Sequence, residues 1–66
     1  MKRQPTVLLT ADEVAVRLGE HIKTVRKHTR RGDYKAFAIN LGAENRPRWR
    51  YDEALLERWI DAKRAA

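Results

Sequence analysis

The hydrophobic pattern of the chain changes its period several times, and the first segment has the spacing of a short amphipathic helix. Its apolar residues fall on one helical face: Val14, Ala15 and Leu18. Thr10, with Glu13 three residues later, forms the capping-box pattern that starts a helix, and Gly19 is a typical helix end. We therefore predict a helix over residues 11–18, preceded by a flexible basic arm over residues 1–7.

A second helix is predicted over residues 22–31, with Gly32 directly after it. Its apolar positions share one face: Ile22, Val25 and Thr29. The opposite face carries cations at the helical spacings i, i+3, i+4 and i+7, and we call them the basic stripe: Lys23, Arg26, Lys27 and Arg30. A face that is merely solvated usually mixes both charge signs. A stripe of one sign therefore favours binding to a polyanion over simple exposure.

The segment after the second helix alternates between polar and apolar residues, which is the pattern of a β-hairpin. On its first strand we expect an apolar face and an opposite face: Phe37, Ile39 and Leu41 against Ala38 and Asn40. The return strand alternates in the same way: Trp49 and Tyr51 against Arg48 and Arg50. Residues 42–47 have turn chemistry. The hairpin is therefore predicted over about residues 36–51, with Arg46 near its tip.

A third helix is predicted over residues 53–63, with Asp52 as a favourable N-cap. Its apolar face is formed by Leu55, Leu56, Trp59 and Ile60. Residues 8–63 are thus expected to form one domain, mainly α-helical with a small β-hairpin. We expect both tryptophans, Trp49 and Trp59, to belong to its core.

Composition narrows the classes of function. The net charge is +6, and it is uneven: residues 1–50 hold twelve Lys and Arg against five Asp and Glu, whereas residues 51–66 hold three against four. The chain has no cysteine, which excludes a disulfide scaffold and a thiolate zinc site. It has no serine nucleophile either, and His21 and His28 lie two helical turns apart, too far for one metal ion. We expect no enzyme, no metal, no cofactor and no membrane association.

The first two helices are joined at Gly19-Glu20-His21, as in a helix-turn-helix, and the basic hairpin stands where a wing would follow. Several motifs resemble the excisionase-type and MerR-type winged helix-turn-helix domains: Leu8-Leu9-Thr10 with Glu13-Val14-Ala15 and Leu18-Gly19, Thr24-Val25-Arg26, Arg30-Arg31-Gly32, Arg48-Trp49-Arg50, and Glu53-Ala54-Leu55 with Trp59. The resemblance covers about residues 8–60. It implies a winged helix-turn-helix fold and double-stranded DNA as the partner.

The chain departs from that family at four positions. Glu20 stands where an apolar residue is usual, His21 where a Ser or Thr cap is usual, His28 where an aromatic is usual, and Thr29 where an aliphatic is usual. Two interpretations stay open: the departures weaken the core contact of the second helix, or they adapt its binding surface.

Few residues follow Ile60, so we expect neither the long dimerisation helix nor the effector domain of MerR-type regulators. The resemblance therefore favours a phage or prophage excisionase, also called a recombination directionality factor. It implies a protein of the bacterial cytoplasm and nucleoid that binds adjacent sites beside copies of itself, bends DNA and directs an integrase toward excision. We expect a monomer in free solution. A small helix-turn-helix transcriptional regulator is the alternative.

The candidate binding residues divide by their position. On the recognition helix, base edges are assigned to Lys23, Arg26 and Lys27, phosphates to Thr24 and Arg30, and a cap or phosphate contact to His21. On the wing the candidates are Arg46, Arg48 and Arg50, with Arg46 placed to enter the minor groove. RNA binding is less favoured because the aromatic residues fall on predicted core faces. A protein-interaction role is a third interpretation, with Glu57 and Asp61 on the third helix facing a partner or a neighbouring wing, although simple solvation of both carboxylates is favoured over it.

Overall fold

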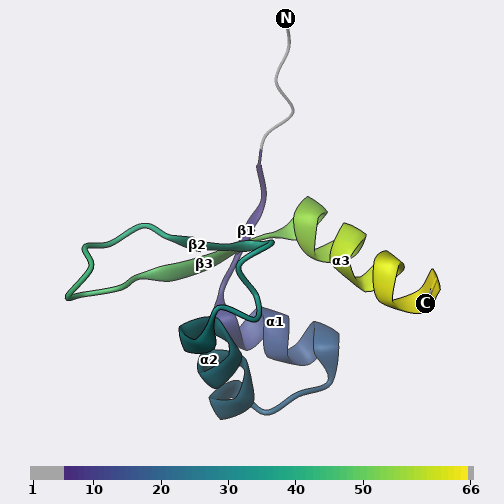
Figure 1. The fold of residues 1–66 in the computed structure, drawn as a ribbon, viewed down its shortest axis with the longest axis horizontal. Coiled ribbons are helices and arrows are strands. Elements are labelled where there is room, and N and C mark those ends of the chain that lie inside the picture. The colour runs from purple at the N-terminus through teal and green to yellow at the C-terminus, as the bar shows by residue number, and fades with distance from the viewer. Residues whose placement is uncertain (1–5, 66) are drawn as a thin grey trace, which may run out of the picture.

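The computed structural model describes residues 6–65, so residues 1–5 of the predicted basic arm lie outside the described part. Residues 6–65 form three helices and a three-stranded antiparallel sheet (Figure 1). Their bounds in chain order are β1 Leu8–Leu9, α1 Ala11–Leu18, α2 Ile22–Arg31, β2 Ala38–Asn40, β3 Trp49–Asp52 and α3 Glu53–Ala65. This order is that of a winged helix-turn-helix domain, so the predicted fold class is confirmed.

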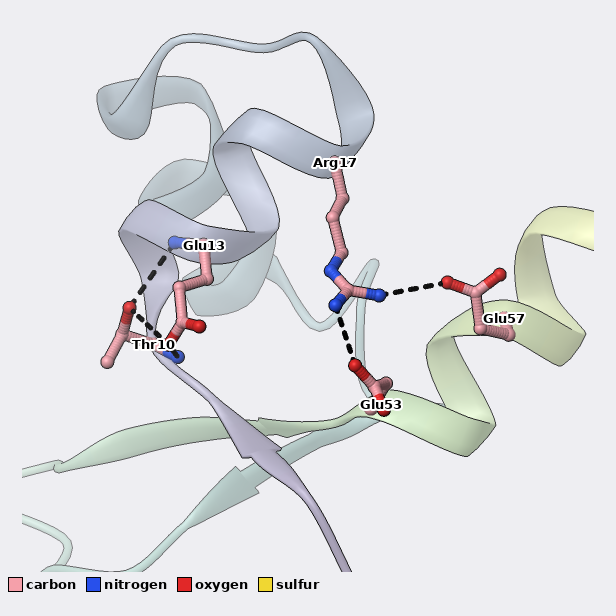
Figure 2. A network of polar contacts seen from close by, with 5 residues as sticks. All are labelled: Thr10, Glu13, Arg17, Glu53 and Glu57. Carbon is pink, nitrogen blue, oxygen red and sulfur yellow. Dashed lines mark hydrogen bonds and ion pairs between the residues drawn. The ribbon is translucent and has the colours of Figure 1, made fainter.

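The ends of α1 and the start of α2 are fixed by local hydrogen bonds. The backbone N–H of Glu13 donates to Thr10 Oγ1 at 3.3 Å, and the backbone N–H of Thr10 donates to Glu13 Oε1 at 3.0 Å, which is the predicted capping box (Figure 2). Gly19 ends α1 in the left-handed conformation, with φ of 65°. His21 then caps the N-terminus of α2, so the turn between the two helices has a capping residue at each end.

The sheet contains one strand that the sequence pattern did not indicate. Its order is β1-β3-β2, with Leu8 paired to Asp52 and Leu9 to Tyr51. A strand of two residues is too short to show an alternating pattern. The return strand of the hairpin therefore lies in the centre of the sheet.

The expected faces of the hairpin's first strand are wrong. Residues directly opposite each other in an antiparallel pair share a face. Ala38 lies opposite Tyr51 and Asn40 opposite Trp49, whereas Ile39 lies opposite Arg50. Of the two other residues expected on the apolar face, Phe37 is buried but lies in the turn before β2, whereas Leu41 follows the strand and is 54% exposed.

The core lies where the sheet, α1, α2 and the first turns of α3 meet. Its buried members are Leu9, Val14, Ala15, Val25, Thr29, Tyr34, Phe37, Tyr51 and Leu56. Trp49 and Trp59 are only partly buried and pack against its margin. The prediction that both tryptophans contact the core is thus confirmed, but neither side chain is completely buried.

A side chain of α1 forms ion pairs with the first two turns of α3. The Arg17 guanidinium lies 2.6 Å from a carboxylate oxygen of Glu53 and 3.1 Å from one of Glu57 (Figure 2). Glu57, for which a contact with a partner molecule was one interpretation, has its carboxylate bound within the domain. No helix within residues 6–65 combines the length and apolar character that crossing a membrane requires.

Candidate nucleic-acid interface

The basic stripe lies on the exposed side of α2. Val25 and Thr29 on the opposite side are buried against the core, which fixes the rotation of the helix about its axis. All members of the stripe are therefore directed to solvent: Lys23, Arg26, Lys27 and Arg30. Thr24, which was assigned to a phosphate, is only partly exposed.

His21 caps the start of α2 with its imidazole ring. The backbone N–H of Lys23 donates to His21 Nδ1 at 3.1 Å, which is the role that Ser or Thr usually fills. Because Nδ1 accepts this hydrogen bond, the neutral ring carries its proton on Nε2. The exposed ring thus offers an N–H donor at the head of the recognition helix.

The tip of the wing is organised by the side chain of Asn40. Its Oδ1 accepts hydrogen bonds from the backbone N–H groups of Gly42 and Arg48, both at 2.9 Å. A Cβ atom at Gly42 would lie 2.3 Å from the carbonyl oxygen of Arg46, so this close approach of backbone requires glycine. The turn presents Arg46 and Arg48 as exposed side chains.

The recognition helix and the wing enclose one open groove of about 520 Å³. Four arginines line it, two from each element: Arg26 and Arg30 on α2, Arg48 and Arg50 on the return strand. Arg50 is the most constrained of them, because its guanidinium donates to the carbonyl of Trp49 at 2.7 Å. Figure 1 shows α2 and the hairpin on the same side of the molecule and α3 on the opposite side.

The cations of this surface are not neutralised by the domain itself. Within residues 6–65, no carboxylate lies within ion-pair distance of the stripe or of Arg46 and Arg48, since the ion pairs of the described chain form elsewhere. Among the described residues, Asp12 at the start of α1 is the one acidic residue that lines the groove. Unneutralised cations in a concave surface concentrate positive potential there, which suits a phosphate backbone.

Two of the unusual polar residues form internal pairs away from the groove. The Tyr34 hydroxyl donates to the carboxylate of Glu20, and burial together with this bond raises the pKa of Tyr34. His28 Nδ1 lies 2.8 Å from an oxygen of Asp33, and this hydrogen bond holds the pKa of Asp33 below its ordinary value. Glu20 and His28 thus adapt the core margin and not the stripe.

The residues that shape the site were harder to find from sequence than the residues that carry its charge. Asn40 and Gly42 hold the wing tip and Arg17 pairs with α3, yet the alternating pattern that includes Asn40 does not indicate its hydrogen bonds, and Gly42 and Arg17 belong to no periodic pattern. Within residues 6–65, no three His, Asp or Glu side chains are grouped so as to hold a metal ion.

A helix-turn-helix whose second helix and adjoining wing share one basic groove defines a winged helix-turn-helix DNA-binding domain. Residues 8–64 match the helix-turn-helix domain family, and the chain belongs to this family. No curated protein and no solved structure matches the chain.

Proposed function

We propose that the protein binds double-stranded DNA sequence-specifically, with α2 in the major groove and the wing at the adjacent minor groove. The observation that carries this proposal is the groove in which unneutralised arginines from α2 and from β3 face each other. The N-terminal half of a recognition helix reaches base edges, so Lys23, Arg26 and Lys27 read bases. Their neighbours hold the backbone: His21 through its Nε2 proton, with Thr24 and Arg30.

The wing acts mainly through its tip. Arg46 enters the minor groove, because the negative potential of a narrow minor groove attracts arginine. Arg48 and Arg50 bind the flanking phosphates. Arg50 contributes less than Arg48, because part of its guanidinium is already bonded to Trp49.

Salt dependence tests this assignment directly. Six exposed cations of α2 and the wing tip carry it, and if five or six of them displace condensed counterions from the duplex, whether they contact a base edge or a phosphate, the slope of log K against log salt is roughly −4.5 to −5.4. Fluorescence anisotropy with a labelled duplex, at several salt concentrations, measures the slope. Arg58→Ala on α3 is the matched control, because Arg58 is exposed outside the groove and its loss should leave the slope unchanged. An affinity that does not depend on salt would overturn the proposal.

We further propose an architectural role of the excisionase kind, in which copies on adjacent sites bend DNA and direct an integrase toward excision. The motif resemblance supports this role, and so does the two-element groove, which fits DNA that is wrapped as well as read. Ligation of short duplexes with tandem sites into circles measures bending, and a recombination assay with a site-specific integrase from the same genome measures direction. Independent filling of unbent sites would favour a small transcriptional regulator instead.

Self-association is proposed to occur on DNA only, with a monomer in free solution. Because Glu57 is bound by Arg17, the contact with a neighbouring wing falls to Asp61, whose pair with Arg64 spans 3.7 Å between largely exposed groups. Such a contact contributes about 0–1 kcal/mol alone, and DNA raises its effective concentration. Sedimentation of the free protein should show monomer mass, and a stable free dimer would contradict the model.

A further inference from the structure

A buried pair of hydroxyl groups joins the two DNA-binding elements. Thr29 on α2 is 5% exposed and Tyr51 on β3 is 1% exposed, yet both reach the lining of the groove. Their hydroxyl oxygens lie 2.7 Å apart. Thr29 Oγ1 also donates to the carbonyl of Val25 at 2.8 Å. Because this bond uses the threonine proton, the tyrosine hydroxyl is the donor to Thr29.

This pair is not explained by stability alone. A buried hydroxyl must be desolvated, so apolar side chains of the same shape at both positions would hold the core about as well. A threonine that bonds the carbonyl four residues earlier also brings little to its own helix. The pair does fix the relative orientation of the two side chains, because a hydrogen bond has a preferred distance and angle, whereas the hydrophobic effect is not directional.

The location of the pair indicates which two elements this directional hydrogen bond orients relative to each other. Thr29 precedes Arg30 and Tyr51 follows Arg50, so the bond connects the backbone positions beside the two walls of the groove. The main packing partner of α2 is α1, and the main partners of β3 are the other strands. Within residues 6–65, the Thr29–Tyr51 contact is the side-chain hydrogen bond that joins α2 to the sheet.

We propose that Thr29 and Tyr51 are positioning residues that hold the wing at a fixed distance and angle from the recognition helix, so that both engage one DNA site together. This inference rests on the proposed DNA binding and adds to it the residues that set the geometry of the groove. Without the pair, α2 would still bind, but the wing would reach the DNA without a fixed register.

The test separates the bond from the packing. Thr29→Val alone leaves the buried Tyr51 hydroxyl without its partner and is expected to lower the melting temperature. The double variant T29V/Y51F removes both polar groups at nearly constant shape, so its melting temperature should return toward that of the original protein. Tyr34→Phe is the matched control, because it removes a buried tyrosine hydroxyl whose partner, Glu20, lies away from the groove.

We expect T29V/Y51F to be folded and to bind its specific site about tenfold more weakly, which corresponds to about 1.4 kcal/mol. The slope of log K against log salt should become shallower by about 1–2, since each lost phosphate contact removes about 0.9. Arg48→Ala should weaken the original protein but add little to the double variant. Tyr34→Phe should keep the original slope and the full effect of Arg48→Ala.

Each result decides between the proposals. If the original protein binds no DNA, the proposed function fails. If it binds DNA and T29V/Y51F keeps the same affinity, slope and response to Arg48→Ala, the positioning role is refuted and the pair only fills space. If the double variant does not fold, Tyr51→Phe alone enters the same assays, because it leaves the Thr29–Val25 bond intact, and the same three readouts decide.

Discussion

The attachment of α3 to the domain depends on Trp59. Truncation of this side chain should lower the free energy of unfolding more than most single substitutions in the domain. The indole meets the rings of Tyr34 and Phe37 edge-on, with centroid separations of 5.6 and 5.3 Å. Each such pair contributes about 0.5–1.5 kcal/mol beyond area burial, and replacing a buried Trp by Ala costs about 3–5 kcal/mol. Because Trp59 is only partly buried, we expect Trp59→Ala to cost about 3 kcal/mol. A domain of this size has about 3–10 kcal/mol in total.

Urea unfolding followed by circular dichroism measures this loss, and the fluorescence of the remaining Trp49 gives a second probe. Leu55→Ala is the matched control on the same helix, because Leu55 is 38% exposed and its truncation should cost within about 0.5 kcal/mol. A loss below about 1 kcal/mol for Trp59→Ala would refute the reasoning, since it would mean that α3 is held by Leu56 and the Arg17 ion pairs without the aromatic cluster.

Three further predictions concern the recognition helix, the wing and the acid limit of stability. Arg26→Ala should cost about 1–3 kcal/mol on the specific site and less on random DNA in competition binding, and equal losses would make Arg26 a phosphate contact. Gly42→Ala places a Cβ against the Arg46 carbonyl and should lower stability by about 1–3 kcal/mol in a thermal melt; unchanged melting and affinity would show that the tip yields freely. The pKa values of Glu13 and Asp33 lie below their ordinary 4.5 and 3.8, because a backbone N–H of Thr10 and the His28 ring bond these carboxylates. Their stabilisation is therefore present above those values and is lost as pH falls through the lowered pKa, so Glu13→Gln should flatten the melting profile below about pH 4.5, and an unaltered profile would contradict this.

The sequence was most informative where structure is local. The capping box at Thr10 and the glycines at 19 and 32 depend on residues within one turn of each other, so the pattern contains all of their partners. The basic stripe was equally visible, because helical spacing alone places its four residues on one face.

Structure that depends on distant partners was not accessible in this way. Nothing near Leu8 indicates that Asp52 will pair with it, and nothing near Arg17 indicates Glu53. The faces of β2 were misassigned because Phe37 is buried by a turn and not by the strand. For Thr29 the sequence left two interpretations open, because its partner Tyr51 lies 22 residues away in the chain.

The central place of β3 has a consequence for how the domain is made. The helices α1 and α2 contact each other through nearby sequence and can form early, whereas β1 must wait for β3, which follows both helices and β2 in the chain. We therefore expect both halves of the sheet to close only after Trp49–Asp52 has emerged from the ribosome. A nascent chain that stops before this strand has two helices, two unpaired strand edges and an exposed apolar surface, which is the kind of species that aggregates. Formation of β3 is therefore expected to complete the recognition surface, and the burial of Leu56 by the helix that follows is expected to complete the protection from aggregation.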